Sequence, residues 1–387
     1  MHICHIFPQF RSLAGGERLV IKICNLLLHK GFKVTLLTLG IKEECERELE
    51  KGVSLLVIAP FLDKIKNHYQ KVFLEHLFVY RLANFIPKDT DFLYFHKSSS
   101  LPALFYFKRF LKGKIPTFYF CYEPPRFLYD LKEETLARLG IWKYFIRPFY
   151  PLFRFLDKKF IGDSGTILTF SRFMEGEIER IYAKRAKMIG PLGVDFPERE
   201  RKERNGDKIL LTVNRLQPRK RVDILITALP LVLKEYPKIK VFIVGTGPEE
   251  EKLKSLVVSL GLEKVVEFCG YVREENLPDF YSQADIYIHL AKNEPFGLSV
   301  LEALSFGLPV VSVKEGGVAE LVEEGETGLF CEPEKEDLAK KILFLLREED
   351  KREEMGKKAG LFVREKFRWE DFIERFIKVL KEKKDVV

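Results

Sequence analysis

Residues 285–305 read DIYIHLAKNEPFGLSVLEALS, and this stretch indicates the fold more directly than any other part of the chain. It opens with a short apolar run typical of a buried strand and ends with the apolar spacing of a helix. Gly297 occupies the turn between the two, where a glycine lets the backbone approach a ligand closely. The N–H groups at the start of a helix have no acceptors within the helix and suit phosphate oxygens. We therefore expect a strand, a turn and a helix that form one side of an anion-binding site.

Short apolar runs alternate with amphipathic helical stretches along the whole chain. Strands are expected at residues 3–7, 33–38, 54–58, 92–95, 117–121, 166–170, 208–213, 240–244, 265–269, 285–290 and 309–313. Helices are expected at residues 16–30, 221–236, 249–260, 299–305 and 336–347. This alternation is typical of parallel sheets covered by helices on both faces. It predicts an α/β fold with two doubly wound, Rossmann-like domains, in which ligands bind at the carboxyl ends of the strands.

The length of 387 residues is enough for two domains of ordinary size. The boundary is expected near residues 190–207, where Gly and Pro are followed by a charged, weakly structured stretch at 197–207. We expect a first domain over residues 1–195 and a second over residues 208–364. Residues 365–387 carry apolar side chains at helical intervals, which predicts a C-terminal helix that packs against an already folded surface.

The net charge of +8 is unevenly distributed along the chain. Residues 1–200 carry 32 Lys and Arg against 22 Asp and Glu, whereas residues 201–387 carry 33 against 35. The basic excess therefore lies in the first half, which favours an anionic partner there, such as a membrane surface, a phosphorylated acceptor or nucleic acid. A solubilising surface would give the same composition.

Cysteine usage and hydropathy indicate the compartment. The 6 cysteines, at positions 4, 24, 45, 121, 269 and 331, include no Cys-x-x-Cys pair and no zinc-like spacing, which is typical of core residues in a reducing compartment. The chain begins with a strand-like sequence, not a signal peptide, and no apolar run reaches the roughly 18–20 residues that span a bilayer. We expect a cytoplasmic protein that at most touches a membrane from that side.

Two carboxylates flank the turn at Gly297. Glu294 lies on the loop before the expected helix and Glu302 lies in its early turns, so both side chains can face the same ligand. Carboxylates accept hydrogen bonds from vicinal hydroxyls, which suits a ligand that carries hydroxyl groups beside a diphosphate. A helix-capping loop with two solvated glutamates is the alternative.

A basic turn, NRLQPRKR at 214–221, follows the strand expected at 208–213. Arg215 and Lys220, with one or more of the neighbouring arginines, can neutralise a departing diphosphate without a metal ion. Two glycine-containing turns, GTGP at 245–248 and AGGER at 14–18, can also contact phosphate. A tight turn alone would explain either glycine pattern equally well.

The ordered set of these segments resembles the family-4 retaining glycosyltransferases of the GT-B fold, a superfamily that includes mannosyltransferases and glycogen-synthase-like enzymes. The resemblance rests on Gly15-Gly16, the turn from Arg215 to Lys220, GTGP at 245–248, EPFGL at 294–298 with Glu302-Ala303, and Gly316-Gly317 with Glu320. It covers the second domain closely and the first loosely. It implies two Rossmann-like domains that face a cleft, and a C-terminal helix that crosses back onto the first domain.

The resemblance also implies roles for individual residues. Arg215 and Lys220 would hold the nucleotide diphosphate, and Glu294 would contact the donor sugar, so these three are the expected catalytic residues. Glu302 would bind the ribose, and the turn at Gly297 would present backbone N–H groups to sugar and phosphate. The residues expected to bind the donor are Gly15, Gly16, Gly245, Gly247, Phe296, Gly297, Leu298, Ser299 and Glu302.

The first domain departs from the family pattern at one place. Many relatives carry His-Glu-Pro there, with the histidine near the reacting sugar, whereas this chain has Tyr122-Glu123-Pro124. A phenol donates a hydrogen bond to a sugar hydroxyl but is a poor general base near neutral pH. Tyr122, Glu123 and Arg126 are candidates for contacts with the acceptor or the sugar, and whether Tyr122 takes over the role of the histidine stays open.

Residues 101–160 combine twelve Lys and Arg with five acids and many aromatics, most densely in WKYFIRPFYPLFRFLDKKF at 142–160. This mixture suits the interface of an anionic membrane, and a buried helix pair with snorkelling cations is the alternative. Arg154, Lys158 and Lys159 are the cations expected to meet lipid. No recognition motif accompanies the charge, so nucleic acid is not expected as a partner.

We predict a retaining, metal-independent hexosyltransferase without a cofactor. It would move a hexose, with mannose as the first choice, from a GDP- or UDP-linked sugar to a hydroxyl acceptor that is lipid-linked or a growing glycan. The motif Asp89-Thr90-Asp91 has the form of a metal-binding Asp-x-Asp, but its place just before a strand favours a local capping role. A transferase with a soluble acceptor, a GT-B-fold nucleotide-sugar epimerase, a phosphorylase and a non-catalytic binding module are the alternatives. The sequence leaves the donor, the acceptor, the linkage and the oligomeric state undetermined.

Overall fold

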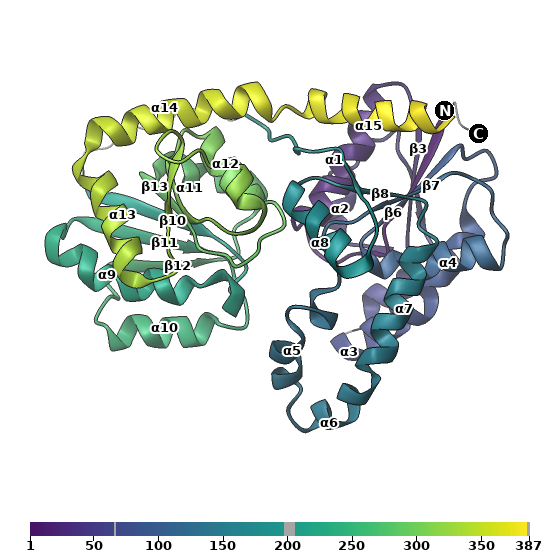
Figure 1. Ribbon diagram of the computed structural model, residues 1–387, viewed down its shortest axis with the longest axis horizontal. Coiled ribbons are helices and arrows are strands. Elements are labelled where there is room, and N and C mark those ends of the chain that lie inside the picture. Colours follow the sequence, from purple (N-terminus) through teal and green to yellow (C-terminus); the bar gives the residue numbers. More distant parts are fainter. Residues whose placement is uncertain (66, 197–205, 385–387) are drawn as a thin grey trace. The chain divides into compact units, whose positions relative to one another are not determined.

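The computed structural model describes residues 1–65, 67–196 and 206–384, and the chain divides into two compact units. The first unit comprises Met1–Gly190 together with Ile373–Val387, and the second comprises Pro191–Phe372. Most of the stretch expected to separate the domains, residues 197–205, lies outside the described residues. Each unit is built around its own parallel sheet (Figure 1).

A seven-stranded sheet forms the centre of the first unit, in the order β5-β3-β1-β6-β7-β8-β9. Its strands are β1 (His2–Ile6), β3 (Lys33–Thr38), β5 (Ser54–Val57), β6 (Phe92–His96), β7 (Thr117–Phe120), β8 (Thr166–Thr169) and β9 (Lys187–Met188). Every pairing in it is parallel. The strand order reverses between β1 and β6, which is the switch point where doubly wound sheets bind ligands. A separate pair is formed by β2 (Gln9–Phe10) and β4 (Gly40–Ile41).

Helices join these strands because apolar side chains recur at helical spacing between them. In the first of these helices Leu19, Ile23 and Leu27, each four residues apart, are all buried. The helices of this unit are α1 (Gly15–His29), α2 (Glu43–Glu46), α3 (His68–Phe78), α4 (Leu101–Arg109), α5 (Lys132–Arg138), α6 (Lys143–Ile146), α7 (Tyr150–Gly162), α8 (Arg172–Tyr182) and most of α15 (Trp369–Lys384). Figure 1 shows α5, α6 and part of α7 extending away from this sheet.

The C-terminal helix α15 packs on the first unit through aromatic and polar contacts. The ring of Phe376 stacks on Tyr94 with 4.6 Å between centroids, and the Arg375 Nε donates a hydrogen bond of 3.1 Å to the carbonyl of Ile189. Tyr94 lies on the central strand β6 and is fully buried. Residues far apart in the sequence therefore share one core.

The second unit is built on a six-stranded parallel sheet in the order β12-β11-β10-β13-β14-β15. Its strands are β10 (Lys208–Val213), β11 (Ile239–Val244), β12 (Val266–Gly270), β13 (Ile286–His289), β14 (Val310–Val313) and β15 (Gly328–Cys331). Numbered within the unit, this is the order 3-2-1-4-5-6 of dinucleotide-binding sheets. The strand order reverses between β10 and β13, which pair directly through Leu210 and Ile286.

Buried aliphatic side chains from this sheet pack against helices. Leu225, Ile226 and Leu229 of α9 form one apolar face, and with Val241 and Ile288 of the sheet they belong to one core cluster. The helices of this unit are α9 (Val222–Glu235), α10 (Glu250–Ser259), α11 (Leu277–Gln283), α12 (Leu298–Ser305), α13 (Lys335–Arg347) and α14 (Glu349–Lys366). Among the residues that the structure describes, no helix has the length and apolar character needed to cross a membrane.

The predicted α/β class with two doubly wound, Rossmann-like units is confirmed. The sequence reading missed four strands, β2, β4, β9 and β15, because all four are short; β2 and β4 form a separate pair, and β9 and β15 lie at the edges of their sheets. It also predicted one helix over residues 365–387, whereas a helix ends and a second one begins within this segment. The α14 helix ends at Lys366, the buried Phe367 leaves helical geometry with φ −125° and ψ 50°, and α15 begins at Trp369.

Candidate active site

The loops that follow β10 and β13 meet at the switch point of the second sheet. The first loop contains a short 3-10 helix, η7 (Pro218–Lys220), and the second leads into α12. The backbone N–H of Lys292 donates a 2.8 Å hydrogen bond to the carbonyl of Arg219, which joins the two loops. The carbonyl of Glu294 in turn accepts a 2.7 Å hydrogen bond from the N–H of Gly317. Backbone contacts therefore hold the side chains of both loops in place.

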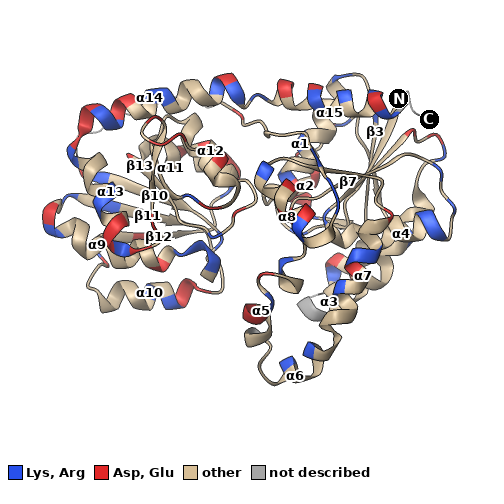
Figure 2. Ribbon diagram, viewed as in Figure 1, with Lys and Arg blue, Asp and Glu red and all other residues tan. Residues whose placement is uncertain are grey.

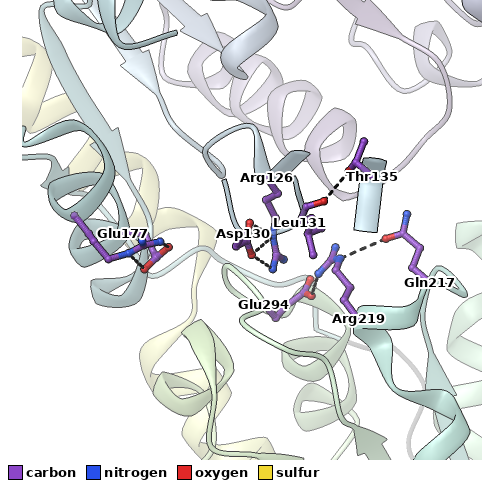
Figure 3. Close-up of polar contacts among 9 residues, drawn as sticks. Arg126, Asp130, Leu131, Thr135, Glu177, Gln217, Arg219 and Glu294 are labelled. Carbon is purple, nitrogen blue, oxygen red and sulfur yellow. Dashed lines mark hydrogen bonds and ion pairs between the residues drawn. The ribbon is translucent and has the colours of Figure 1, made fainter. Parts of the chain in front are cut away.

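Two cations share one carboxylate at this point. The Glu294 Oε2 accepts hydrogen bonds of 2.7 Å from Arg219 Nη1 and of 2.7 Å from Lys220 Nζ. Figure 3 shows the Arg219 guanidinium directed at Glu294, with Gln217 on its other side, where the Arg219 Nε donates 3.3 Å to the Gln217 Oε1. The side chains of Arg219, Lys220 and Glu294 are 16%, 8% and 17% exposed. The cluster, which we call the Glu294 cluster, leaves one positive charge in excess at a partly open surface.

The electrostatics of the cluster keep Glu294 ionised. Burial raises the pKa of the Glu294 carboxyl, but the nearby charges of Lys220 and Arg219 lower it more, and the net pKa lies well below the ordinary value of a glutamate. His289, the last residue of β13, is 1% exposed. Burial, and then the charge of Lys220, lowers the pKa of His289 to about 3, so its ring is neutral at physiological pH. The site thus combines the charged side chains of Arg219, Lys220 and Glu294 with a buried, neutral histidine at the end of β13.

Two glycines expected to bind the donor, Gly245 and Gly247, pack against the backbone of the basic turn at 214–221. A Cβ on Gly245, which has φ +122°, would lie 1.9 Å from the carbonyl oxygen of Asn214, and a Cβ on Gly247 would lie 2.2 Å from that of Leu216. Any side chain at either position would therefore displace the loop that carries Lys220. The GTGP turn has a packing role whether or not it also touches a ligand.

The α12 helix begins directly after Gly297, whose φ of 102° suits glycine. Its first residues, Leu298 and Ser299, present N–H groups that have no acceptor within the helix. Glu302 follows one turn later, and its Oε2 accepts a 2.8 Å hydrogen bond from the hydroxyl of the buried Tyr281. Tyr281 therefore orients the carboxylate that the resemblance assigns to ribose. Phe296 is buried and anchors the turn.

Arg215 is placed differently from Lys220. Its side chain is exposed, and within the described part of the chain it makes no ion pair, whereas Arg219 contacts Glu294. The next cation, Arg221, donates a 2.8 Å hydrogen bond to Glu315. The structure therefore brings together Lys220, Glu294 and an arginine, and that arginine is Arg219.

The remaining predicted residues belong to the first unit. Gly15 and Gly16 open α1, and a Cβ on Gly16 would lie 3.1 Å from the Cε of Lys97 and 3.6 Å from the ring of Tyr122. Glu123 is partly exposed. Arg126 forms an ion pair with Asp130, to which its Nε donates 2.9 Å.

Tyr122 belongs to a buried chain of hydrogen bonds. Its hydroxyl lies 2.8 Å from His96 Nδ1, and His96 Nε2 lies 2.9 Å from His5 Nδ1. Tyr122 is only 8% exposed, and both histidines are fully buried. Burial lowers the pKa of His5 to about 3 and that of His96 well below its ordinary value, so both rings are neutral. The structure thus turns the phenol inward onto an imidazole.

Comparison with known families bears on the second unit. The signature of the family described as glycosyl transferases group 1 matches residues 195–362. The chain carries a group 1 glycosyltransferase domain. The Glu294 cluster and Glu302 both lie inside this glycosyltransferase domain. Within the described residues no group of three or more His, Cys, Asp or Glu side chains could hold a metal ion.

Curated relatives of the chain are named for different substrates. The chain is 30% identical over 201 residues to N-acetyl-alpha-D-glucosaminyl L-malate synthase of Bacillus anthracis, covering 51% of this chain and 50% of that protein. It is 29% identical over 231 residues to the GDP-mannose-dependent alpha-(1-6)-phosphatidylinositol monomannoside mannosyltransferase of Mycobacterium tuberculosis, covering 54% and 60%. The chain therefore spans about half the length of the curated relatives it matches.

A solved structure extends the likeness beyond the glycosyltransferase domain. HepE of Anabaena, solved in complex with UDP and glucose, aligns over 99% of this chain and 100% of its own with a TM-score of 0.73 and 19% identity. At that identity the likeness is one of fold, and it confirms the predicted GT-B class for both units.

Three features of the site escaped the sequence reading. The contact of Arg219 with Glu294 was hidden among four neighbouring cations, and the roles of Tyr281 and His289 depend on strand and helix packing. The only signal for His289 was its position at the end of a strand that precedes the Glu294 loop.

Proposed function

We propose that the protein is a retaining, metal-independent hexosyltransferase that uses a GDP- or UDP-linked sugar, with mannose as the first choice of sugar. One observation supports this most strongly: Lys220 and Arg219 lie on the carboxylate of Glu294 at the switch point of a group 1 glycosyltransferase domain. Such an arrangement offers positive charge to a diphosphate and an ionised carboxylate to sugar hydroxyls. No cofactor takes part in the proposed reaction.

The cations and the start of α12 would stabilise the leaving nucleotide diphosphate. Lys220 and Arg219 supply fixed charges, and Arg215, which is exposed, is free to turn toward a bound phosphate. The N–H groups of Leu298 and Ser299 add the positive end of the helix dipole. Groups that are already in place when negative charge develops lower the barrier without reorganisation. A divalent ion is not required for this role.

Glu294 would orient the donor sugar through its hydroxyls, and Glu302, held by Tyr281, would bind the ribose. In the proposed step the bond between the anomeric carbon and the phosphate oxygen breaks while a bond to the acceptor oxygen forms on the same face. The acceptor's proton passes to the departing phosphate oxygen, so the atoms balance and the configuration is retained.

We place the acceptor in the class of lipid-linked or growing glycans, reached at an anionic membrane on its cytoplasmic side. The basic excess of residues 1–200 supports an anionic partner. A mycobacterial relative whose name specifies GDP-mannose and a phosphatidylinositol mannoside supports mannose and a lipid acceptor, and the UDP and glucose bound to HepE support UDP-glucose as the next donor to test.

A panel of nucleotide sugars tests donor binding directly. A ligand that binds only the folded protein raises its melting temperature, so GDP-mannose, UDP-glucose and UDP-N-acetylglucosamine are compared in EDTA and in Mg²⁺. We expect one of them to raise the melting temperature equally in both. Stabilisation that needs Mg²⁺ would contradict the metal-independent mechanism, and a product that is an isomer of the donor would identify an epimerase.

Glu294→Gln tests the chemistry, because it keeps the shape of the side chain and removes its charge. We expect the transfer rate to fall by roughly 100- to 1,000-fold, the range found when one transition-state contact is removed. Glu315→Gln is the matched control, since Glu315 also pairs with an arginine, Arg221, in the same unit. Its rate should stay within about threefold of the wild type. Full turnover by Glu294→Gln would refute the role given to Glu294.

A further inference from the structure

A cluster of large apolar side chains is exposed at the end of the extension formed by α5, α6 and α7 (Figure 1). We call Ile141, Trp142, Tyr144, Phe145 and Phe149 the aromatic tip; their exposed fractions are 71%, 64%, 68%, 64% and 53%. They fall within nine consecutive residues, 141–149. Scattered single apolar side chains are normal on a protein surface, but a contiguous apolar patch marks an interaction site.

The extension that carries the aromatic tip is a folded element with a small core of its own. Leu128, Leu136 and Tyr150 are buried together. The hydroxyls of Tyr129 and Tyr182 donate hydrogen bonds of 2.7 and 2.9 Å to the buried Asp157 of α7. The tip is therefore presented outward by packed and hydrogen-bonded structure behind it.

The charge around the aromatic tip is positive. Residues 140–160 contain five Lys and Arg and one acid, and that acid is the buried Asp157. Lys143 lies over the ring of Tyr144, 5.0 Å from its centroid. The Arg147 side chain is 60% exposed, and its Nη2 lies 3.7 Å from the Oε1 of Glu133 on α5, which offsets part of its charge. Lys143 begins α6 and Arg147 directly follows it, and Figure 2 shows blue, basic segments at this end of the extension. Cations thus alternate with exposed aromatic rings.

One cation expected to meet lipid is turned inward. The Arg154 Nε donates a 2.6 Å hydrogen bond to the carbonyl of Leu128, and its guanidinium lies 5.4 Å from the centroid of the Tyr129 ring. Arg154 therefore braces the extension. The cations within residues 141–149 are Lys143, which is partly exposed, and Arg147, which is exposed.

We propose that the aromatic tip inserts into the interfacial layer of an anionic phospholipid bilayer, with Lys143 and Arg147 facing the lipid phosphates. Amphipathic aromatic rings suit the layer between headgroups and acyl chains, and basic side chains beside them are attracted by anionic lipid. The charge complementarity favours this partner over a second copy of the chain, because two copies of the tip would bring like charges together.

This inference deepens the proposed function, since it names the surface by which the enzyme reaches a lipid-borne acceptor, and it rests on that proposal only for the identity of the acceptor. Membrane binding itself is independent of transfer. The two are separable because the tip lies in the first unit and the Glu294 cluster in the second.

Sedimentation with phosphatidylglycerol vesicles tests the proposal. The full chain should bind these vesicles and should bind pure phosphatidylcholine vesicles more weakly. Combining Trp142→Ser with Phe145→Ser should lower the partition coefficient by roughly 100-fold, because two large rings no longer leave water. Combining Lys143→Gln with Arg147→Gln should lower it about 25-fold at low salt, and this loss should shrink at high salt, where the aromatic loss persists.

The control replaces two equally exposed apolar side chains of the second unit, Val258→Ser with Leu361→Ser, each of which is 61% exposed in the native protein. It should bind vesicles like the wild type. The altered side chains are exposed or, for Lys143, partly exposed, so all variants should keep a melting temperature close to that of the wild type. A wild-type chain that stays in the supernatant, or tip variants that bind fully, would overturn the proposal.

Light scattering separates a lipid surface from a protein interface. A wild-type dimer that the Trp142→Ser, Phe145→Ser variant converts to a monomer would assign the tip to self-association and overturn the proposal. Donor hydrolysis by water gives the second readout and needs no membrane. If the tip variant loses vesicle binding but keeps hydrolysis, the proposal holds. If the wild type hydrolyses the donor but binds no vesicles, the membrane proposal fails while the proposed use of a nucleotide sugar stands.

Discussion

The two units share a strand order but place different chemistry at the same edge of the sheet. In the second unit the switch point holds three charged side chains, with Lys220 and Arg219 both 2.7 Å from Glu294. In the first unit a neutral chain lies at the ends of the corresponding strands, where the Tyr122 hydroxyl is 2.8 Å from His96 and the charge of Lys97 is offset by its ion pair with Glu17. Topology therefore determines where a ligand site lies, and the residues at the strand ends determine which ligand it suits.

Lys220 of the second unit and Lys97 of the first unit also differ in burial and in how far a carboxylate offsets their charge. Lys220 has an exposed fraction of 8% and shares its carboxylate with an arginine, which leaves positive charge in excess. Lys97 of the first unit is 35% exposed and pairs at 2.8 Å with Glu17, which forms no second ion pair within the described chain. Its ammonium also lies 4.4 Å from the centroid of the Phe7 ring. We infer that the second unit supplies most of the charge for the diphosphate.

The largest expected difference compares Lys220→Ala with Lys97→Ala. Removing Lys220 takes away a preorganised charge, so kcat/KM should fall by roughly 100- to 1,000-fold. Removing Lys97, whose charge is offset by Glu17, should lower kcat/KM by less than about tenfold. Steady-state transfer assays measure both, with circular dichroism as the check on folding. Equal losses would break the contrast between the units.

The second prediction concerns pH and the buried His289. An unfolded histidine has a pKa near 6.5, whereas burial lowers that of His289 to about 3. Between these values the unfolded chain binds a proton that the folded chain does not, so the free energy of unfolding is greatest above pH 6.5 and falls as the pH drops toward 3. At pH 4.5 His289 alone should lower the free energy of unfolding by about 3 kcal/mol relative to its value above pH 6.5.

His289→Leu should remove that part of the pH dependence, measured by urea unfolding with Trp369 as the fluorescent reporter in a Trp142→Phe background. Trp369 belongs to the second unit and Trp142 to the first. Ile288→Val on the same strand is the control, and it should lower the unfolding free energy by about 1 kcal/mol equally at every pH. An unchanged slope in His289→Leu would show that other groups cause the pH dependence.

The smallest expected effect concerns the neutral chain of the first unit. Tyr122→Phe removes the hydroxyl that contacts His96 and leaves the buried Nδ1 of His96 without this hydrogen-bond partner. The free energy of unfolding should therefore fall by about 1–2 kcal/mol. Hydrogen exchange of β1, β6 and β7 measures the loss. Tyr94→Phe is the matched control, because the buried Tyr94 hydroxyl has no hydrogen-bond partner in the described chain and its removal should be neutral. If the transfer rate of Tyr122→Phe falls although its hydrogen exchange matches that of the wild type, Tyr122 would be assigned a contact with substrate.

Much of this architecture could be predicted from local patterns. Strands such as Lys33–Thr38 and Lys208–Val213 were located correctly, because short apolar runs bounded by polar turns leave few alternatives. Edge strands such as Gly328–Cys331 were not, because their pairing depends on a neighbour far along the chain. The division of the C-terminal segment at Phe367 likewise depends on where that ring is buried.

The sequence by itself determined the α/β class, the two parallel sheets and the loop on which Glu294 lies, since strand–helix alternation and a turn glycine are local properties of the chain. Only the tertiary structure decided that Arg219 is the arginine at Glu294, that Tyr281 orients Glu302, that Tyr122 turns onto His96 and that Arg154 faces inward. Each of these contacts joins residues from different loops, helices or strands. Their geometry arises only when the packed elements fix the distance and direction between side chains, which no spacing along the sequence records.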